Sequence, residues 1–303
     1  IRIYNMFKKT LIAMSLAAVT GSAMADVSVS GRVEQTFTDT DGNTTGLVGS
    51  SDNHIVFSAS EDLGNGMSAF AKVMLDTDGQ DGASKDEIVG LKGSFGTVFA
   101  GRFEAFVEGN VASTMTMNGN AAIEQSTANV GRASQGIAYV SPTVNGFHIG
   151  VGGYASGALS ESEDFDAKEV AVFYANGPID VKIARQTLNN TLASTTFSET
   201  TTAIALAYTM GDAKVSYLRM ANDDFNGTND SVDNSYRLDY TMGANKITVA
   251  HLDDETTSGA SGADVTALEL THSFSKRTQA YVGMTDSDTA STDTTYFGLQ
   301  HSF

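Results

Sequence analysis

The stretch TTYFGLQHSF, residues 294–303, alternates between apolar and polar side chains up to the last residue of the sequence. Phe297, Leu299 and Phe303 fall on one face of an extended chain, together with His301. Successive side chains of a β-strand point to opposite faces of the sheet, so this period of two predicts a strand with one apolar face. Because terminal residues usually fray into water, an apolar face that continues to Phe303 predicts a last strand embedded in apolar surroundings.

The same alternation divides residues 26–303 into about sixteen segments of about ten residues each. Short connections such as Asn145-Gly146 and Gly211-Asp212 alternate strictly with long acidic connections rich in Ser and Thr. Short turns at one rim and long loops at the other are typical of a membrane β-barrel. In hydrocarbon every backbone N–H and C=O must be hydrogen-bonded, so strands cross a membrane only in a closed sheet. The sequence therefore predicts an all-β fold, a 16-stranded antiparallel transmembrane β-barrel.

A soluble two-sheet sandwich is the alternative fold. Its inward faces would have to carry apolar side chains that fill a core. In this chain the faces opposite the apolar ones carry Ser, Thr, Arg, Lys, Glu and Gly. Such faces suit the wall of an aqueous channel, which a barrel of sixteen strands is wide enough to leave open. The composition of the polar faces therefore favours the barrel.

Residues 1–25 have the order of a secretory signal peptide. Two lysines precede a short apolar run, and the small residues Ala23-Met24-Ala25 follow it. We expect cleavage before Asp26, which leaves residues 26–303 as a single β-barrel domain. The residues before Met6 read as upstream sequence and are excluded. A retained membrane anchor is the alternative, but the apolar run is too short to span a bilayer.

The chain is acidic, with 36 Asp and Glu against 18 Lys and Arg and a formal net charge of −18. Residues 1–25 hold three bases and no acid, so their removal leaves 15 bases against 36 acids, a net charge of −21. This charge repels the phosphates of nucleic acid, which is excluded as a partner. The chain has no Cys and therefore no disulfide framework. Beyond residue 25 no stretch approaches the about 18 apolar residues of a membrane helix.

One long insertion, from Ala105 to Ala133, breaks the regular pattern. A connection of this length without secondary structure is uncommon unless it is functional. It lies between IVGLKGSFGTVFAGR (residues 88–102) and GRASQGIAYVSPTVNGFHIGVGGY (residues 131–154). With these blocks the chain resembles the general diffusion porins of Gram-negative bacteria, in particular the neisserial-type and marine gammaproteobacterial porins.

The resemblance implies a location and an assembly. It implies a homotrimer of 16-stranded barrels in the Gram-negative outer membrane. A third extracellular loop, here the long insertion, would fold inward and narrow the channel opposite a wall of basic side chains. The barrel-assembly machinery would read the terminal aromatic strand through Phe303. Outer-membrane lipid and lipopolysaccharide would surround the barrel, and the acidic loops would reach lipopolysaccharide phosphates through bridging divalent cations.

Strand parity selects candidate residues for the basic wall. Three valines share the outward face of the first strand, so Arg32 is expected to point into the channel. The same argument turns two lysines of the third and fourth predicted strands inward. Phe99 is expected to face outward, which places Arg102 inside. The candidate basic wall is therefore Arg32, Lys72, Lys92 and Arg102.

The long insertion supplies the candidate acids of the constriction, Glu104, Glu108 and Glu124, and Arg132 at its end is a further candidate base. Opposed charges across a narrow aqueous gap create a transverse field, which orients dipolar solutes and disfavours apolar ones. The Pro-Glu-Phe-Gly-like tip that many loops of the family carry is absent. MTMNGN (residues 115–120) stands in its place.

Motifs for catalysis and metal binding are incomplete. The five His lie in different predicted strands, none at metal-ligand spacing, so no enzyme activity and no cofactor are expected. An outer-membrane lipase with Ser and His on its outer face is the alternative. DTDGQDGASKDE (residues 76–87) begins like a calcium loop, but Asp81 occupies the position of the required Gly. An acidic hairpin is favoured over a metal site formed by Asp76, Asp78, Asp81 and Glu87.

These observations predict a passive channel for ions and small hydrophilic solutes. The excess of acids predicts a mild preference for cations. A substrate-selective channel of the same fold is one alternative. A surface or adhesive barrel protein that conducts nothing is the other.

Overall fold

The computed structural model describes residues 26–41, 46–49, 53–77, 84–118, 131–155, 165–192, 195–223, 230–256, 264–288 and 293–303. The predicted signal peptide lies outside these ranges and stays a prediction. Seventeen strands form one antiparallel sheet, of which β2, four residues long, pairs with β1 and the other sixteen form the wall. None of the helices in the described ranges has both the length and the apolar character needed to cross a membrane.

The strands are β1 (Asp26–Thr40), β2 (Gly46–Gly49), β3 (His54–Gly64), β4 (Met67–Asp76), β5 (Asp86–Gly93), β6 (Gly96–Glu104), β7 (Arg132–Val140), β8 (Phe147–Tyr154), β9 (Ala167–Asn176), β10 (Ile179–Leu192), β11 (Thr195–Met210), β12 (Ala213–Asp223), β13 (Ser231–Met242), β14 (Asn245–Thr256), β15 (Val265–Ser273), β16 (Thr278–Ser287) and β17 (Thr294–Ser302).

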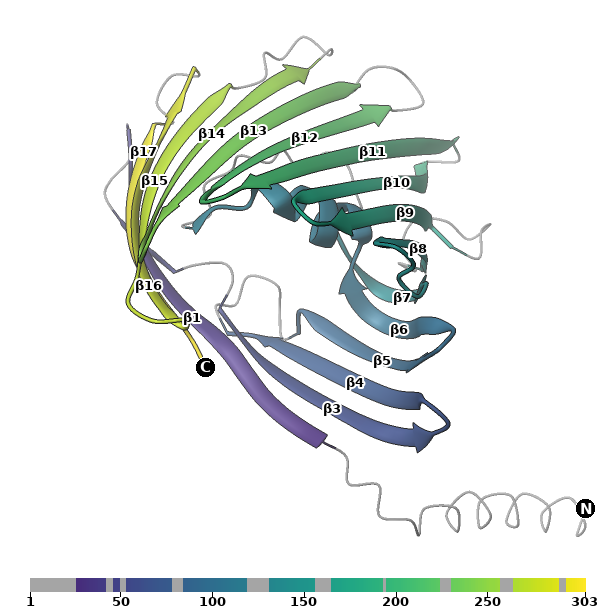
Figure 1. The fold of residues 1–303 in the computed structure, drawn as a ribbon. Helices are drawn as coiled ribbons and strands as arrows, with labels where there is room; N and C mark the ends of the chain where they lie inside the picture. Colours follow the sequence, from purple (N-terminus) through teal and green to yellow (C-terminus); the bar gives the residue numbers. More distant parts are fainter. Residues whose placement is uncertain are drawn as a thin grey trace, which may run out of the picture.

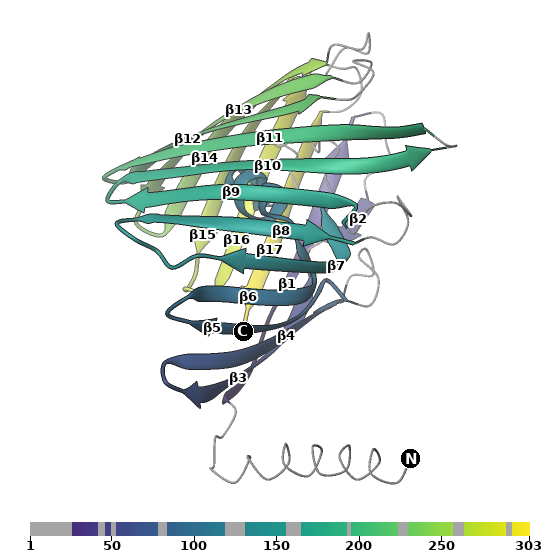
Figure 2. The same ribbon diagram turned by 90° about the vertical axis from the view of Figure 1, so that its right-hand side faces the viewer.

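The sheet closes on itself at β1. This strand pairs with β3 from Asp26 to Arg32 and with β17 from Arg32 to Thr40, so Arg32 lies opposite both His54 and Ser302. From β3 onward each strand pairs with the next one in the chain. Figures 1 and 2 show the strands inclined around one cylinder. The predicted closed, 16-stranded antiparallel barrel is confirmed.

Apolar side chains cover the outer face of the wall. On β11, Leu206 and Tyr208 are 42 and 47 % exposed, whereas Ala205 and Ala207 on the inner face are buried. Exposed large apolar residues recur at every second position on neighbouring strands as well, from Val27 on β1 to Leu299 on β17. A continuous apolar band of this extent is too large for a water-soluble monomer and suits contact with lipid.

The terminal strand is fixed at the seam of the barrel. Phe297 stacks on Phe37 of β1, with ring centroids 4.9 Å apart. Phe303 N–H donates to the Gly31 carbonyl at 3.0 Å, and Gly31 N–H donates to the Phe303 carbonyl at 3.1 Å. The Phe303 ring covers Gly31, where an added Cβ would lie 2.6 Å from it. The predicted alternation therefore continues to the last residue, with Phe297, Leu299 and Phe303 on the outer face.

The short connections have the residues that their backbone requires. In the turn between β3 and β4, Gly64, Asn65 and Gly66 have φ angles of 79°, 52° and 74°. In the turn before β8, Asn145 has a φ of 51°. Gly and Asn tolerate this left-handed region, so the sequence fixes tight turns at one rim of the barrel. We call this the short-turn rim and the other the long-connection rim.

Phe99 faces inward, and the prediction that it faces outward was wrong. It pairs with Gly90 and Ala138, and its ring packs edge-on against Phe103 with centroids 4.8 Å apart. The outward residue is its neighbour Val98, which is 37 % exposed. Apolar character did not identify the lipid-facing side here, because the inner wall is also apolar where the insertion enters the barrel.

β10 and β11 are longer than the sequence indicated. They have 14 and 16 residues instead of about ten, because β10 continues to Leu192 and β11 begins at Thr195. The two strands pair from Ile179 opposite Tyr208 to Leu192 opposite Thr195. Thr is β-branched and fits a pleated strand, so a Thr-rich stretch can extend a hairpin instead of ending it.

Candidate pore constriction

The connection between β6 and β7 enters the barrel. Its first part forms η1 (Val107–Val111) and η2 (Ala112–Met115), which lie inside the cylinder in Figure 1. We call residues 105–118 the inner segment. The prediction that the long insertion folds inward is confirmed for this segment, and residues 119–130 lie outside the described part of the chain.

One side of the inner segment is apolar and buried. Val107, Val111 and Met115 are fully buried in one cluster with Leu218 and Met220 of β12. Neighbouring strands offer the small side chains that let the segment approach, namely Ala171, Ala184, Ala203 and Ala205. Burial of about 25 cal/mol per Å² of apolar surface favours this contact over a hydrated loop. The segment is therefore packed on the wall formed by β9 to β12.

Glu169 of β9 holds the start of the inner segment. Its Oε2 accepts a hydrogen bond from Phe106 N–H at 2.8 Å and its Oε1 accepts one from Val107 N–H at 2.5 Å. Tyr154 Oη donates to Oε2 at 2.6 Å. The carboxylate is only 5 % exposed. It satisfies two backbone donors that begin a helical turn, which have no partner within the turn itself.

The other end of the inner segment is held by side chains of β13, β15 and β16. Arg237 Nη1 of β13 donates to the Thr116 carbonyl at 2.6 Å. Asn118 Nδ2 donates to Glu269 Oε1 of β15 at 2.8 Å, and Asn118 Oδ1 accepts from Gln279 Nε2 of β16 at 2.9 Å. The segment therefore spans the barrel wall from β9 to β16, with a carboxylate anchor at each end.

The wall formed by β4 to β7 carries ionic side chains instead. Lys72 Nζ donates to Asp86 Oδ2 at 2.6 Å, and Arg132 Nε donates to Asp86 Oδ1 at 3.1 Å. Arg132 Nη2 lies 3.3 Å from Glu104 Oε1. Asp86 is buried and the two bases are half-buried, so the shared carboxylate fixes the positions of both bases on the inner wall.

The side of the inner segment that is not packed on the wall is polar. Asn110, Ser113 and Thr116 are exposed, and Glu108 is half-buried. Glu108 is the only acid in residues 105–118. Hydroxyl, amide and one carboxylate group therefore face the remaining lumen, where solutes would pass.

Two of the predicted wall bases, Arg32 of β1 and Lys72 of β4, lie on the inner face. Arg32 Nε is 3.9 Å from Glu34 Oε2, and Glu34 accepts a hydrogen bond from Tyr281 Oη at 2.5 Å. Lys72 is the partner of Asp86 described above. Lys92 shares their face but is exposed beside the Gly93–Gly96 turn, four residues beyond Ile88, which pairs with Lys72. It therefore lies nearer the short-turn rim than the other two.

Arg102 loses the parity argument that placed it in the channel. Arg102 pairs with Glu87, and Glu87 lies on the same face of β5 as the outward Val89. Arg102 Nε donates to the Lys85 carbonyl at 3.1 Å. Glu104 is bonded to Arg132 as given above, Glu108 lies in η1, and Glu124 lies outside the described residues. The constriction role of each of these residues stays a prediction.

The suggested metal loop is not assembled in the described part of the chain. Asp76 lies 4.0 Å from Lys85 Nζ, and its strand parity puts it on the inner face. Glu87 pairs with the outward Val73 and therefore lies on the other face of the sheet. Asp78 and Asp81 lie outside the described residues. Among the described residues no group of three or more His, Cys, Asp or Glu could hold a metal ion.

Sequence reasoning did not find Glu169, Asp86 or Arg237. A signal for Glu169 was present, since it is the one acid on a strand face whose other members are Ala167, Ala171 and Phe173. An acid on an apolar face is expected to be buried and hydrogen-bonded. Its partner, a backbone N–H of a distant loop, could not be read from the sequence.

Comparisons with known proteins agree with this architecture. The family described as Gram-negative porin matches residues 12–292. The chain belongs to this family. Porins of this family are proteins of the Gram-negative outer membrane, which gives the location of the chain and assigns the apolar outer face to membrane lipid.

Curated relatives match over shorter stretches. The major outer membrane protein P.IB of Neisseria lactamica is 35 % identical over 118 residues, 33 % of this chain and 34 % of that protein. The protein of the same name from Neisseria gonorrhoeae is 37 % identical over 115 residues, 31 % of each chain. The match thus spans about a third of these relatives.

Solved structures show the same fold over nearly the whole chain. The anion-selective porin from Comamonas acidovorans has a TM-score of 0.74 at 21 % identity, covering 92 % of this chain and 100 % of that one. OmpT of Vibrio cholerae, in a trimer form, has a TM-score of 0.74 at 15 % identity, covering 92 and 99 %. At these identities the likeness concerns the fold alone.

Proposed function

We propose that this porin forms a water-filled channel for passive diffusion of ions and small hydrophilic solutes. The observation that carries the proposal is the inner segment, which is anchored along one side of a closed barrel and presents its polar side to the rest of the lumen. Sixteen strands enclose more space than side chains fill, so the segment narrows the passage without plugging it. Passive diffusion needs no catalytic group, cofactor or metal, and we propose none.

The orientation and assembly follow from the same features. The long-connection rim would face outside and the short-turn rim the periplasm. We propose a homotrimer, supported by the trimer form of the structurally similar OmpT of Vibrio cholerae. The assembly machinery would recognise the terminal strand through Phe303, whose backbone closes the seam with Gly31. Divalent cations would link the acidic long connections to lipopolysaccharide phosphates.

The proposed ion preference is mild and favours cations. Three bases of the lumen have acid partners: Lys72 and Arg132 share Asp86, and Arg32 lies beside Glu34. Lys182 of β10 instead donates to Thr114 Oγ1 of the inner segment at 3.2 Å. Glu108 is added from the inner segment. Since these three bases are compensated and the chain as a whole is acidic, a small excess of negative charge would act on ions in transit.

Reconstitution of the mature protein in a planar bilayer tests the proposal. We expect stepwise ohmic conductance that grows in proportion to salt concentration. Under a salt gradient we expect a reversal potential whose sign indicates cation selectivity. A reversal potential that indicates anion selectivity would overturn the proposed cation preference but not the proposed channel. Saturable block of the current by one sugar or nucleotide would indicate a substrate-selective channel. A folded protein that inserts without conductance would indicate a surface protein and contradict the proposal.

A further inference from the structure

A row of basic side chains lies on the outer face of the barrel. It consists of Lys168 of β9, Arg185 of β10 and Arg219 of β12. The residues that flank each of these on its own strand are no more than 5 % exposed and belong to the inner face. Alternation therefore turns the three bases outward. We call them the basic row.

The basic row marks the end of the apolar band. On β10, Ile179, Val181 and Ile183 face outward on the side of the short turn, and Arg185 is the next outward residue. On β12, Tyr217 is the last such apolar residue before Arg219. The long side chains of Lys and Arg can lie over apolar surface with the charge in a polar layer. The row therefore lies where the hydrocarbon of the membrane meets the headgroups.

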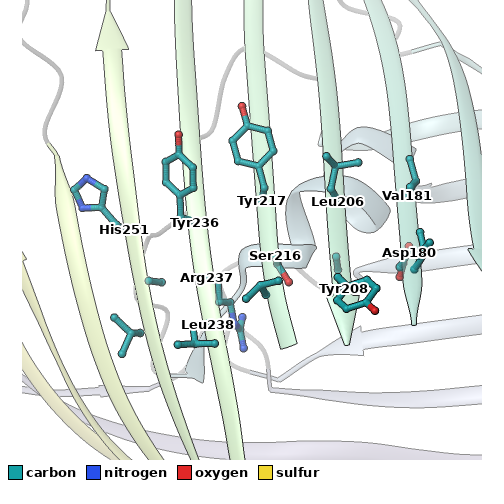
Figure 3. Close-up of a pocket in the computed structure, with 15 residues that line it drawn as sticks. Asp180, Val181, Leu206, Tyr208, Ser216, Tyr217, Tyr236, Arg237, Leu238 and His251 are labelled. Atoms are coloured by element: carbon teal, nitrogen blue, oxygen red, sulfur yellow. The ribbon is translucent and has the colours of Figure 1, made fainter. Parts of the chain in front are cut away.

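An apolar hollow of about 700 Å³ lies in the outer face beside the basic row, toward the short-turn rim. Its lining includes Val181, Leu206, Tyr208, Tyr217, Tyr236 and Leu238. Figure 3 shows Tyr217 and Tyr236 side by side, with both hydroxyls directed toward the same end of the strands. That end is the long-connection rim, since Tyr217 Oη donates to Asn234 Oδ1 at 2.8 Å. The hollow is thus lined by apolar side chains and has polar groups at its edge toward the long-connection rim.

The two arginines are placed to bind one headgroup together. Arg219 Nη1 also donates to Asn234 Oδ1 at 3.3 Å, which holds its guanidinium above the tyrosines. Arg185 is exposed, and its side chain makes no hydrogen bond or ion pair with any residue that the structure describes. Two strands and one two-residue step separate them, about 12 Å between Cα atoms for ordinary strand spacing. Arg185 can therefore turn toward a headgroup bound at Arg219, so that both guanidinium groups contact it.

The charge of the row contrasts with the rest of the chain. Three bases lie within four neighbouring strands of a protein whose net charge is −18. On the same face of β12 to β14, the acids of the described strands lie at the borders of the row, at Asp223 near the end of β12 and at Asp253 and Glu255 on β14. An anionic group is thus attracted to the row and repelled at its borders. Aligned Lys and Arg beside apolar membrane surface are the sequence feature that recognises anionic lipid headgroups.

We propose that the basic row and the hollow form a specific site for lipopolysaccharide, with its lipid A phosphates on Arg185 and Arg219 and acyl chains in the hollow. Lipopolysaccharide is the phosphorylated lipid of the leaflet that the long-connection rim faces, so the site rests on the proposed orientation. The contact is direct and needs no divalent cation. It is independent of conduction, which concerns the inner face.

Native mass spectrometry of the assembled porin, refolded without lipid and titrated with diphosphorylated lipid A in the presence of EDTA, tests the site. The variant Arg185→Gln/Arg219→Gln keeps side-chain length and removes two charges. Lys276→Gln/Arg277→Gln removes two charges at the short-turn rim and is the matched control. A charge-assisted hydrogen bond contributes enough that the loss of each arginine weakens binding about tenfold or more. We expect the control to bind like the unchanged protein.

Three further arms identify the occupant. We expect lipid A without phosphates to bind as weakly as the arginine variant does, and phosphatidylglycerol to compete poorly. Equal binding by the arginine variant, or by phosphate-free lipid A, would overturn the site. Equal binding of phosphatidylglycerol would overturn its specificity. If the arginine variant instead changes the oligomeric mass with lipid binding unaltered, the surface is an interface between copies of the chain. Retained heat-modifiable mobility on a gel shows that each variant is folded.

Discussion

The two sides of the lumen are built by different means. Beside the inner segment, β9 to β12 offer alanines and large apolar residues, and Glu169, which anchors the start of the segment, is buried. From β4 to β7 the inner wall carries the ion pairs of Lys72, Asp86 and Arg132, whose two bases remain partly exposed. The first wall resembles a protein core and the second a protein surface. The difference shows that one side of the inner wall can bind a loop while the other side keeps an aqueous passage open.

The largest effect is expected from Glu169→Ala on the packed wall. The Phe106 and Val107 amides would lose their acceptor, and a buried amide without a partner costs about 1–3 kcal/mol. We expect the inner segment to detach at its start, so that single-channel conductance rises and the open current becomes noisy. Planar-bilayer recording measures both changes.

Glu199→Ala is the control for that change. Glu199 is also on the inner-facing parity, on β11, but it is only half-buried and anchors no part of the inner segment in the contacts found among the described residues. We expect its conductance to match that of the unchanged protein. A Glu169→Ala channel that is equally quiet and equally conducting would show that the segment does not depend on this anchor.

A second prediction concerns packing on the same wall. Met115 is fully buried against Leu218 and Met220, so Met115→Ala should leave a cavity and cost about 2 kcal/mol or more. We expect a lower urea midpoint for unfolding from lipid vesicles. Ser113→Ala, an exposed change on the same turn, should lie within about 0.5 kcal/mol of the unchanged protein. If the two variants unfold alike, the segment is not packed as described.

A third prediction concerns the wet wall. Asp86→Asn removes the acid shared by Lys72 and Arg132, so that Arg132 keeps Glu104 and the lumen loses one negative charge beside Lys72. Asn keeps an oxygen acceptor at the same place for both bases, so their positions should change little. We expect the reversal potential under a salt gradient to move toward anion selectivity. Asp180→Asn on β10 removes one lumen charge without freeing a base and should move it less; equal shifts would contradict the role of the pair.

The smallest effect is expected at Lys92. It is exposed beside the turn that joins β5 and β6, away from the ion pairs of the wet wall. Lys92→Gln should change unfolding by less than about 0.5 kcal/mol and leave the reversal potential unaltered. A shift as large as that of Asp86→Asn would place Lys92 at the constriction, as the sequence first suggested.

The barrel could be predicted from the sequence because its physics is local. Alternation along each strand and Gly or Asn in most short turns indicate the number of strands, their antiparallel order and the closed sheet without knowledge of any distant contact. Phe297, Leu299 and Phe303 behaved as their spacing indicated. The length of the insertion likewise predicted that it was special.

The lumen was less predictable because its contacts join distant parts of the chain. The parity argument for Arg102 took Phe99 as lipid-facing, but Phe99 packs against Phe103 on the inner side. Both faces of the wall are apolar at that point, so hydropathy carries no information on direction there. Glu169 and Val107 lie 62 residues apart in sequence, and only the folded chain brings the carboxylate to the amide.

The central claim is that the inner segment lies in the passage with one side packed and the other wet. The chain contains no Cys, so a single introduced thiol gives an unambiguous signal. We predict that a charged methanethiosulfonate reagent reduces the current of Ser113→Cys channels, because Ser113 faces the lumen, and leaves Met115→Cys channels unmodified. Equal reaction of both thiols, or full modification of Ser113→Cys without loss of current, would contradict the account.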